Sequence, residues 1–527
     1  MEAKGFLFGT VGVVAILNGT VAVLAFLKDV LTATNFGTSL AADSLTLAYF
    51  LPDTIGNNLI ASAIGVSCVP VFAKAFASGS KAHFVNLVRT TTIFFCLLAL
   101  AVWLVLWLYN NEATALLAGS STSTLGRLTA SLIQILLSTI VIFPVFAVGS
   151  ALLQTTGIFS VPAGAPLLSH LLIILVLIYS MVMHLDQVQM VYLVAWSLLL
   201  GAIAMTAFIW FVIWRKKPLR AMGDSRMIDH AAIEHISRDR QAQGQLWKIF
   251  VPYLLILASS QIGYFVERNL AAGMGSGIVA GLNYAFRLSQ LPVWVFVAAI
   301  YSVVLPSMSQ DVFLNQTVKL KSTIANAFKD ILLVTLPTTL FLFFLRVPII
   351  SILFQRGAFN EHSVYITAEI LKGYSLSIIG LSISAVCVRY FLAAGKMLLP
   401  LAVSIFASGV NIAADYLLKD TLGAASLGYG AAIGATVSAV LLTMLISKEL
   451  QLSIQSAIRI FGKMLMANAL PSLLLFLLFL SWNYFDGNNG KGIGIIILAS
   501  GSLACLVIYY ATLRKIKLIR NSGWKGR

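Results

Sequence analysis

Charged side chains inside apolar stretches are the residues of this sequence most able to do chemistry. Lys28 and Asp29 are adjacent at the end of the first long apolar stretch, and Arg287 lies within a later one. A charge at mid-membrane costs about 2.5–3.5 kcal/mol on insertion scales, so such residues should face a cavity or a partner. Two such cations could neutralise an anionic head group. The alternative is that Lys28 extends to the membrane interface and Arg287 pairs with a carboxylate for structure alone.

Oxygen-bearing side chains form a second group. Asn411 and Asp415 are four residues apart, so their oxygens project from one helix face. With Glu267 from another stretch they could bind a hard cation such as Na⁺, because hard cations prefer oxygen ligands. The alternative is a hydrogen-bonded contact between helices. Glu369 and Lys372 are three residues apart and are expected to neutralise each other.

A polar stretch directly after Pro52 interrupts the second apolar run. It contains Asp53 and Asn57, and Asp43 precedes it in the same run. This pattern predicts a bent or broken helix, and breaks of that kind often mark the substrate region of transporters. We therefore count Asp43, Asp53 and Asn57 among the candidate substrate-binding residues.

Membrane-spanning helices must position these residues. The chain has 527 residues, of which 59% are hydrophobic and 10% charged, against roughly 25% charged in an average soluble protein. This composition excludes a water-soluble enzyme and a disordered chain. Hydropathy predicts an all-α integral membrane protein of about fourteen transmembrane helices. The predicted spans are 7–27, 40–72, 83–109, 128–153, 160–183, 189–214, 246–266, 279–308, 325–347, 364–393, 397–418, 427–447, 457–482 and 493–513.

The distribution of basic residues predicts the orientation. Most of the 35 Lys and Arg residues lie at helix ends that face the cytoplasm if the N-terminus is inside. This bias favours two cytoplasmic termini. It also explains the net charge of +16 as a topology signal that can touch anionic lipid, without nucleic acid as a partner. The external ends hold Lys28, Arg127, Arg268, Arg346, Arg356, Lys419 and Lys491.

Several catalytic patterns are missing from the sequence. It has no Walker A motif, no Asp-x-Asp and no His-Glu-x-x-His, and the only long connection between spans is basic and carries no catalytic pattern. The four cysteines lie in apolar surroundings without Cys-x-x-Cys spacing, which is typical of small buried hydrophobic residues. We therefore expect a protein that is not an enzyme and has no catalytic residues.

A weak internal repeat predicts the domain organisation. Leu51-Pro52 recurs as Leu291-Pro292, Asp43 corresponds to Asn283, and Lys28 corresponds to Arg268. Six spans per copy keep both copies in one orientation, so their pseudo-two-fold axis should run along the membrane normal. The predicted parts are an N-lobe (1–214), a basic cytoplasmic linker (215–245), a C-lobe (246–451), and a last helix pair with a basic cytoplasmic tail (452–527).

Several segments together resemble one known family over essentially the whole chain. They are Lys28-Asp29-Val30-Leu31, Leu51-Pro52 through Val69-Pro70-Val71-Phe72, Glu267-Arg268-Asn269-Leu270-Ala271, Leu282-Asn283-Tyr284-Ala285 with Arg287-Leu288, Gln290-Leu291-Pro292, and Leu353-Phe354-Gln355-Arg356-Gly357-Ala358-Phe359. On these segments the chain resembles the MurJ/MviN lipid II flippases of the bacterial cell envelope, within the multidrug/oligosaccharidyl-lipid/polysaccharide exporter superfamily.

The resemblance implies fourteen spans, two six-span lobes that alternate access, and a final helix pair that forms a groove for a polyprenyl tail. The partner it implies is lipid II, an undecaprenyl-diphosphate-linked glycan lipid, carried in the inner membrane for cell-wall synthesis. We expect the chain to act as a monomer. Lys28, Asp29 and Arg287 match the family's central cavity residues. Glu267, Asn411 and Asp415 match a sodium site of some members, with Thr436 as a further ligand. Na⁺ is thus a candidate coupling ion, and no other cofactor is expected.

The sequence also departs from the family pattern. Ala22 stands where the family usually has Arg, and Asp53, Gly56-Asn57 and Ala61-Ser62 replace its usual Asn, Arg-Arg and Glu-Gly. A flippase for another polyprenyl-linked glycan therefore remains an alternative. A cation-coupled drug exporter and a non-transporting scaffold are the others.

Overall fold

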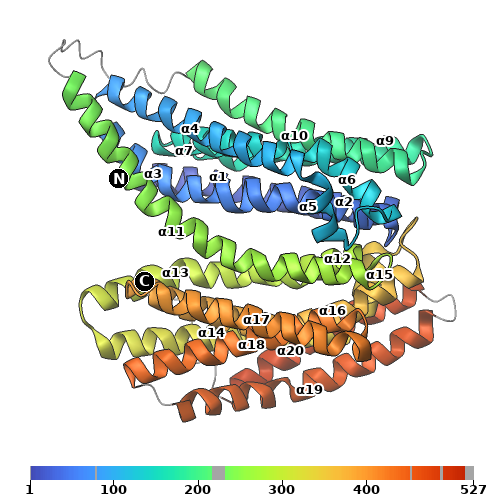
Figure 1. The fold of residues 1–527 in the computed structure, drawn as a ribbon. Helices are drawn as coiled ribbons and strands as arrows, with labels where there is room; N and C mark the ends of the chain where they lie inside the picture. The colour runs from blue at the N-terminus through green and yellow to red at the C-terminus, as the bar shows by residue number, and fades with distance from the viewer. Residues whose placement is uncertain (1, 78–79, 217–231, 452–453, 487–490, 517–527) are drawn as a thin grey trace. The chain divides into compact units, whose positions relative to one another are not determined.

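The computed structural model describes residues 2–77, 80–216, 232–451, 454–486 and 491–516 (Figure 1). Within these residues the secondary structure is helical and contains no strand. The first half comprises α1 (Glu2–Phe36), α2 (Leu40–Pro52), η1 (Asp53–Ala61), α3 (Ser62–Ala77), α4 (Lys81–Leu108), α5 (Asn110–Ala118), α6 (Thr124–Leu136), α7 (Thr139–Thr155), α8 (Ser160–Gly164), α9 (Pro166–Val182) and α10 (Gln187–Lys216). The second half comprises α11 (Ala232–Gly273), α12 (Ile278–Pro292), η3 (Val293–Val297), α13 (Ala298–Phe313), α14 (Thr317–Phe344), α15 (Arg346–Phe354), α16 (Glu361–Ala393), α17 (Leu398–Leu422), α18 (Ala425–Leu450), α19 (Ile454–Asp486) and α20 (Lys491–Lys515).

Thirteen candidate membrane spans occur in the described residues. They correspond to thirteen of the predicted spans, and the predicted span at 279–308 has no counterpart among them. In that region α12, η3 and α13 follow one another directly, with a π-helical turn after Pro292. The prediction of an all-helical, multi-pass membrane protein is confirmed, with thirteen spans identified instead of about fourteen.

The chain divides into two compact units, Met1–Val279 and Ala280–Arg527. This boundary differs from the predicted start of a second lobe at residue 246, because α11 packs with the first unit. Trp247 and Phe250 of α11 pack at a tilt against Phe95 of α4, with ring centroids 6.1 and 5.0 Å away. The second part of the predicted linker 215–245 is helical, since α11 begins at Ala232. Residues 217–231 and the predicted basic tail from 517 lie outside the described residues.

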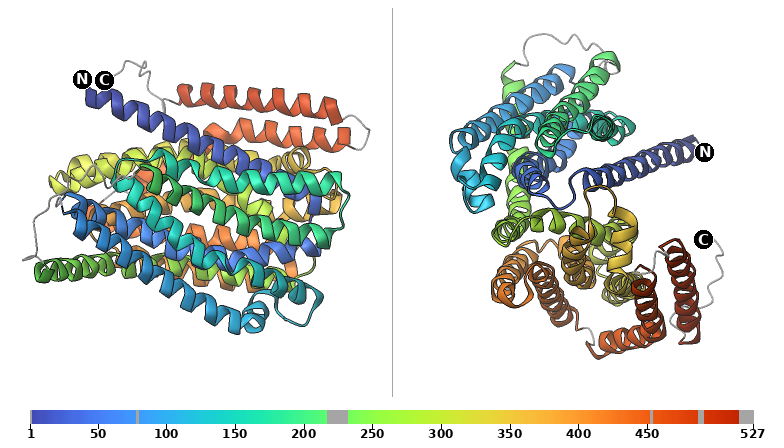
Figure 2. Two further views of the ribbon diagram at one scale, coloured as in Figure 1. Left: turned by 90° about the horizontal axis from the view of Figure 1, so that it is seen from above. Right: turned by 90° about the vertical axis from the view of Figure 1, so that its right-hand side faces the viewer.

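Within the second unit, α16 packs against α14 and α18, and α17 packs against α18. The last helices, α19 and α20, form a pair that Figure 2 shows side by side. α19 contacts α14, and the Tyr509 hydroxyl of α20 donates a hydrogen bond to the Leu333 carbonyl of α14 (2.9 Å). The predicted terminal helix pair is therefore anchored to this unit.

The lengths of corresponding helices support the internal repeat in addition to the sequence matches. α4 and α14 both have 28 residues, and α5 and α15, which directly follow them, both have 9. Pro52 and Pro292 both end an α-helix and precede a π-helical segment. Proline's ring clashes with the carbonyl one turn earlier, which favours a widened turn at these positions. The predicted break after Pro52 is thus a π-helix, repeated in the second half.

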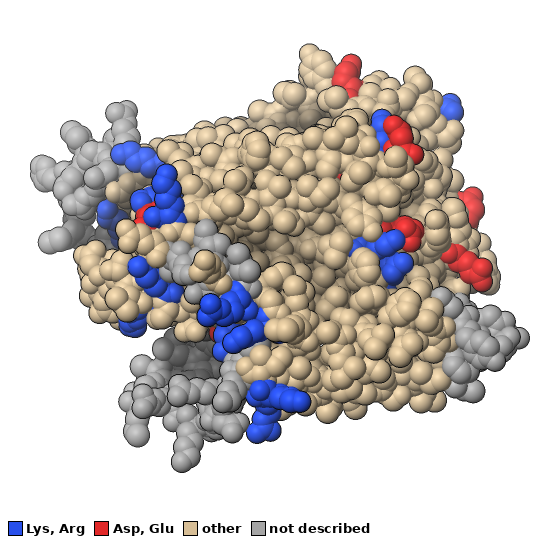
Figure 3. All heavy atoms as spheres, turned by 90° about the horizontal axis from the view of Figure 1, so that it is seen from below, with Lys and Arg blue, Asp and Glu red and all other residues tan. Residues whose placement is uncertain are grey.

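The charged side chains gather toward helix ends, and the surface over the middle of the helices is mostly uncharged, as Figure 3 shows for one face. Large apolar side chains such as Leu97, Leu175 and Met466 are more than half exposed at such positions. An apolar band of this kind matches the hydrocarbon core of a bilayer, which is about 30 Å thick.

Glycine allows the closest helix crossing in the second unit. A Cβ atom at Gly428 of α18 would lie 2.2 Å from the Ile370 carbonyl oxygen of α16, and one at Gly373 would lie 2.2 Å from the Gly428 carbonyl carbon. Small residues at such crossings let helix backbones approach within the membrane. The α16–α18 pair therefore requires glycine at these two positions.

We expect Gly428→Val to destabilise the protein, because the obstructing atoms are backbone atoms that cannot rotate away. Overpacking typically costs about 1–3 kcal/mol, so the melting temperature of the purified protein should fall by several degrees. Gly409→Val on α17 is the matched control, since a Cβ atom at Gly409 would have nothing within 4 Å. Equal melting temperatures for the two variants would contradict this assignment.

Candidate functional site

Lys28 and Asp29 form an ion pair inside α1. Lys28 Nζ lies 3.0 Å from Asp29 Oδ1, and the two side chains are 17% and 14% exposed. The prediction that they end the first span is wrong, because α1 continues to Phe36, about 12 Å further at 1.5 Å per residue. Polar side chains in that last part bond to carbonyls one turn back on the same helix, as the Thr32 hydroxyl does by donating to the Lys28 carbonyl (2.8 Å). Because the pair lies well before the end of α1, the Asp29 carboxylate is expected to neutralise the Lys28 charge within the span.

Asp43 has a backbone partner. It is 1% exposed on α2, and its carboxylate accepts a hydrogen bond from the backbone N–H of Gly277, in the turn after α11. Gly277 has φ +87°, and a Cβ atom there would lie 2.4 Å from the Thr38 carbonyl oxygen. The turn after α1 therefore packs tightly on the turn after α11. At the repeat offset of the Leu-Pro pair these turns are equivalent, so Asp43 connects matching points of the two repeats.

Asp53 and Asn57 lie on the π-helix η1. Asp53 accepts hydrogen bonds from the side-chain amides of Asn57 (3.0 Å) and Asn58 (3.2 Å), while Asn57 is exposed. A π-helix places residues five apart one above the other, which lets Asp53 reach both amides. The two predicted residues are brought together, and they form a local polar cluster at the break.

Glu267 and Arg268 lie on α11 in the first unit. Glu267 is 2% exposed. The Arg268 guanidinium lies 4.2 Å from the Phe50 ring centroid and donates a hydrogen bond to the Tyr264 carbonyl. Arg268, which corresponds to Lys28 in the repeat, thus contacts an aromatic ring. Its next residue is Asn269, so it lacks the adjacent carboxylate that Asp29 gives Lys28. Arg287 lies on α12 in the second unit with a partly exposed side chain.

Asn411 and Asp415 face α18 from α17. A Cβ atom at Gly430 would lie 1.8 Å from Asp415 Oδ1 and 2.8 Å from Asn411 Oδ1, and one at Gly434 would lie 2.8 Å from Asn411 Cβ. Asn411 Oδ1 is buried and accepts no hydrogen bond from the described residues. Asn411 Oδ1 and Asp415 Oδ1 thus lie beside glycine backbone of α18. Such oxygens are the ligands that a hard cation prefers.

Thr436 does not join this pair. It is exposed on α18, and its hydroxyl donates to the Ala432 carbonyl (2.7 Å). At about 100° per residue it lies roughly 200° around the helix from Gly434. Among the predicted ion ligands, the structure therefore brings together Asn411 and Asp415. In the described residues no group of three or more His, Cys, Asp or Glu side chains could hold a metal.

The expected Glu369–Lys372 pair is replaced by another contact. Glu369 Oε1 lies 3.9 Å from Nη2 of Arg346, which begins α15. Arg346 also donates to the Phe343 carbonyl (2.7 Å). No periodicity links residues so far apart in sequence, so sequence reasoning missed this pair. It also missed the contact of Arg389, whose guanidinium lies 3.6 Å from the Tyr301 ring centroid.

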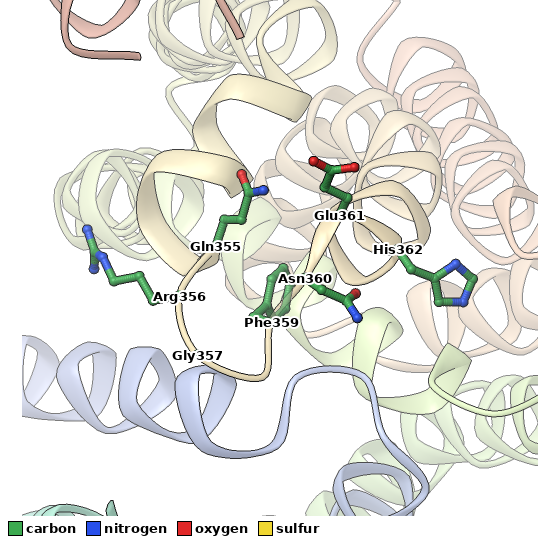
Figure 4. Close-up of a pocket in the computed structure, with 7 residues that line it drawn as sticks. All are labelled: Gln355, Arg356, Gly357, Phe359, Asn360, Glu361 and His362. Atoms are coloured by element: carbon green, nitrogen blue, oxygen red, sulfur yellow. The ribbon is translucent and has the colours of Figure 1, made fainter. Parts of the chain in front are cut away.

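A shallow hollow of about 570 Å³ lies over the turn between α15 and α16. Figure 4 shows its polar side chains diverging, with Arg356 and His362 on opposite sides. Asn360 is occupied in capping α16, where it accepts from the Ser363 N–H (3.0 Å). Binding sites have convergent polar groups, which this hollow lacks. It is lined by Gln355, Arg356, Gly357, Phe359, Asn360, Glu361 and His362.

The same turn explains the motif from Leu353 to Phe359. Phe354 and Phe359 are buried and pack against Tyr284 of α12, each with ring centroids 5.5 Å from it. Two segments that are prominent in the sequence thus form one aromatic cluster. This contact is structural, since it fixes the turn to α12 within the second unit.

Comparison with known proteins gives concordant matches. A family model described as lipid II flippase MurJ matches residues 32–515. The chain is 23% identical over 472 residues to a probable lipid II flippase MurJ of Treponema pallidum, covering 86% of this chain and 85% of that protein. It is 24% identical over 434 residues to the lipid II flippase MurJ of Burkholderia cenocepacia, covering 80% of each.

Solved structures share the fold. The lipid II flippase MurJ in an inward closed conformation superposes with a TM-score of 0.74 at 22% identity, covering 95% of this chain and 99% of that one. An inward-facing multidrug resistance MATE family transporter of the MOP superfamily superposes with a TM-score of 0.67 at 16% identity, covering 83% and 98%.

Proposed function

Because the chain belongs to the lipid II flippase MurJ family, we propose that it carries lipid II from the inner to the outer leaflet of the bacterial cytoplasmic membrane. The ion pair of Lys28 and Asp29 is the observation that carries this proposal. The pair is 17% and 14% exposed within a candidate spanning helix, where an ionisable group is expected to serve a functional site. The diphosphate of lipid II is an anionic group that Lys28 could bind there. The protein acts as an integral membrane transporter and not as an enzyme.

Asp29 neutralises Lys28 when no substrate is bound. The substrate diphosphate would displace this carboxylate and accept charge-assisted hydrogen bonds from Lys28, which are roughly twice as strong as neutral ones. Arg287 of α12, in the second unit, is a further candidate cation for the substrate. We assign both termini to the cytoplasm, in agreement with the basic residue distribution. We also propose a monomeric state.

Asp43 contributes to the conformational cycle. It fixes the turn after α1 to the turn after α11 through the Gly277 N–H. In an alternating-access cycle this contact would form in one state and break in another, since packed interfaces switch between discrete arrangements. Asp43 therefore acts on the equilibrium between states, in place of the substrate contact expected from sequence.

Asn411 and Asp415 of α17 would hold Na⁺. A bound cation supplies charge compensation for the buried Asp415 carboxylate. The membrane potential is the alternative driving force, and it is worth about 2.3 kcal/mol per charge per 100 mV.

Sodium binding predicts a measurable stabilisation. A ligand at 100 times its dissociation constant stabilises a protein by about 2.7 kcal/mol, so NaCl should raise the melting temperature above that in KCl. Asp415→Asn should abolish this difference. Asp420→Asn, an exposed position on the same helix, should retain it. No difference between Na⁺ and K⁺ for the unaltered protein would rule out the site.

Complementation tests the function itself. Expression of this chain in a strain depleted of its lipid II flippase should restore growth and remove the lipid II that accumulates in the inner leaflet. Failure to restore growth with normal membrane insertion would overturn the lipid II assignment.

A flippase for another polyprenyl-linked glycan is the second candidate, favoured by Ala22 and Asp53 at positions where the family has other residues. Tighter binding of the purified protein to another polyprenyl diphosphate glycan than to lipid II would support it.

A further inference from the structure

An apolar groove lies in the first unit, away from the residues assigned above. It has a volume of about 440 Å³ and is formed by α4, α7 and α10, where α7 packs against both neighbours (Figure 1). Val88 and Leu152 form its buried floor, and Val85 and Ile93 form its exposed rim. Its volume is within the range of about 300–1,000 Å³ typical of ligand sites.

The wall of the groove is fixed in place. The Trp210 indole Nε1 donates a hydrogen bond to the Val145 carbonyl of α7 (3.2 Å). A Cβ atom at Gly149 would lie 2.6 Å from Ile209 Cγ2 and 3.2 Å from Trp210 Nε1, so α7 and α10 are in close contact beside the groove. A wall held by backbone contact forms the groove before any ligand binds, which lowers the entropy cost of binding.

The groove has one charged lining residue. Arg89 is exposed, and no ion pair involves it within the described residues. Thr92, the remaining polar lining residue, donates its hydroxyl to the Val88 carbonyl of its own helix (2.8 Å). Arg89 lies about 12 Å along α4 from Lys81, at the end assigned to the cytoplasm. From there a long guanidinium side chain reaches the lipid head groups.

We propose that this groove binds an anionic phospholipid of the cytoplasmic leaflet, with one acyl chain along α7 and the phosphate on Arg89. The apolar floor matches an acyl chain, and the cation matches the negative charge of that leaflet. A second copy of the chain fits less well, because an isologous contact through this groove would bring two Arg89 side chains together. This lipid site is independent of which glycan lipid the protein carries.

Native mass spectrometry of the purified full-length protein tests the proposal, with palmitoyl-oleoyl phosphatidylglycerol and phosphatidylcholine as probes. We expect one phosphatidylglycerol to be retained about fivefold more tightly than phosphatidylcholine. This factor corresponds to the attraction of about one interfacial cation for an anionic lipid. Arg89→Gln should remove this preference. Arg127→Gln, which removes an exposed cation at the other end of the unit's helices, should keep it.

Val85→Trp tests the apolar part separately, because it fills the rim and leaves Arg89 in place. This variant should retain both phosphatidylglycerol and phosphatidylcholine less tightly, and the loss of retention should be similar for the two lipids. Two results would overturn the proposal. One is equal retention of both lipids by the unaltered protein, which indicates ordinary annular lipid. The other is an equal loss of preference in the Arg89→Gln and Arg127→Gln variants, which indicates a general effect of surface charge.

Discussion

Lys28→Gln is expected to abolish complementation of a flippase-depleted strain, whereas Lys28→Arg retains it. The Gln side chain removes the positive charge but keeps a similar length. A hydrogen bond to a charged group contributes about 1.5–3 kcal/mol, so lipid II should bind roughly 10- to 150-fold more weakly to the purified Gln variant. Arg keeps the charge and adds a planar fork that matches phosphate oxygens.

The partly buried carboxylate partner of Lys28 complicates a single substitution. Removing Lys28 leaves the Asp29 carboxylate, 14% exposed, without its 3.0 Å cation. The cost of that uncompensated charge could lower stability instead of substrate binding. The double variant Lys28→Gln/Asp29→Asn separates the two effects, because it removes both charges. If Lys28 contacts the substrate, the double variant folds but stays inactive.

Lys74→Gln is the matched control for the loss of one cation. Lys74 is exposed in the last turn of α3, and its removal should leave lipid II binding unchanged. Full activity of the double variant would contradict a substrate-binding role for Lys28 and support the non-transporting alternative.

Hydropathy predicted the membrane class and most spans because these depend on local composition. The break after Pro52 was also predictable, since proline disrupts the hydrogen-bond ladder wherever it stands. The end of the first helix was not predictable in this way. Charges at 28 and 29 looked like a terminus, but Lys28 and Asp29 neutralise each other in an ion pair, and α1 continues to Phe36.

Contacts between segments that are distant in sequence limited how much of the candidate site could be predicted. Spacing on one helix correctly grouped Asn411 with Asp415, because both lie on the same face of α17. It wrongly paired Glu369 with Lys372, since the carboxylate reaches Arg346 of another helix. The Asp43–Gly277 contact joins segments more than 200 residues apart, and no sequence period encodes it. Its consequence is best tested directly.

Asp43→Ala is expected to open the contact between the turns after α1 and α11. The substitution leaves the buried Gly277 N–H without its acceptor, which costs about 1–3 kcal/mol. If that contact exists in only one conformational state, the equilibrium should shift by roughly 5- to 150-fold toward the other state. Flipping activity should fall accordingly, because a transporter must visit both states.

Labelling of a Thr38→Cys reporter by a membrane-impermeant maleimide measures the shift. Thr38 lies against Gly277, so the labelling rate should rise about tenfold or more in the Asp43→Ala background. Ser39→Ala is the matched control. Ser39 caps the same helix by accepting from the Ala42 N–H (3.3 Å). Its loss costs about 1 kcal/mol and leaves the Asp43 carboxylate in place.

A Gly277 variant tests the same contact from its other side. Gly277→Ala introduces a Cβ into the space occupied by the Thr38 carbonyl, at a φ of +87° that alanine disfavours. If Asp43 and Gly277 act through one contact, the two substitutions should be strongly non-additive in the labelling assay. Additive effects, or equal rates for Asp43→Ala and Ser39→Ala, would mean that Asp43 only stabilises α2. A labelling rate that rises for both single variants and no further in the double variant places the conformational switch at this pair of turns.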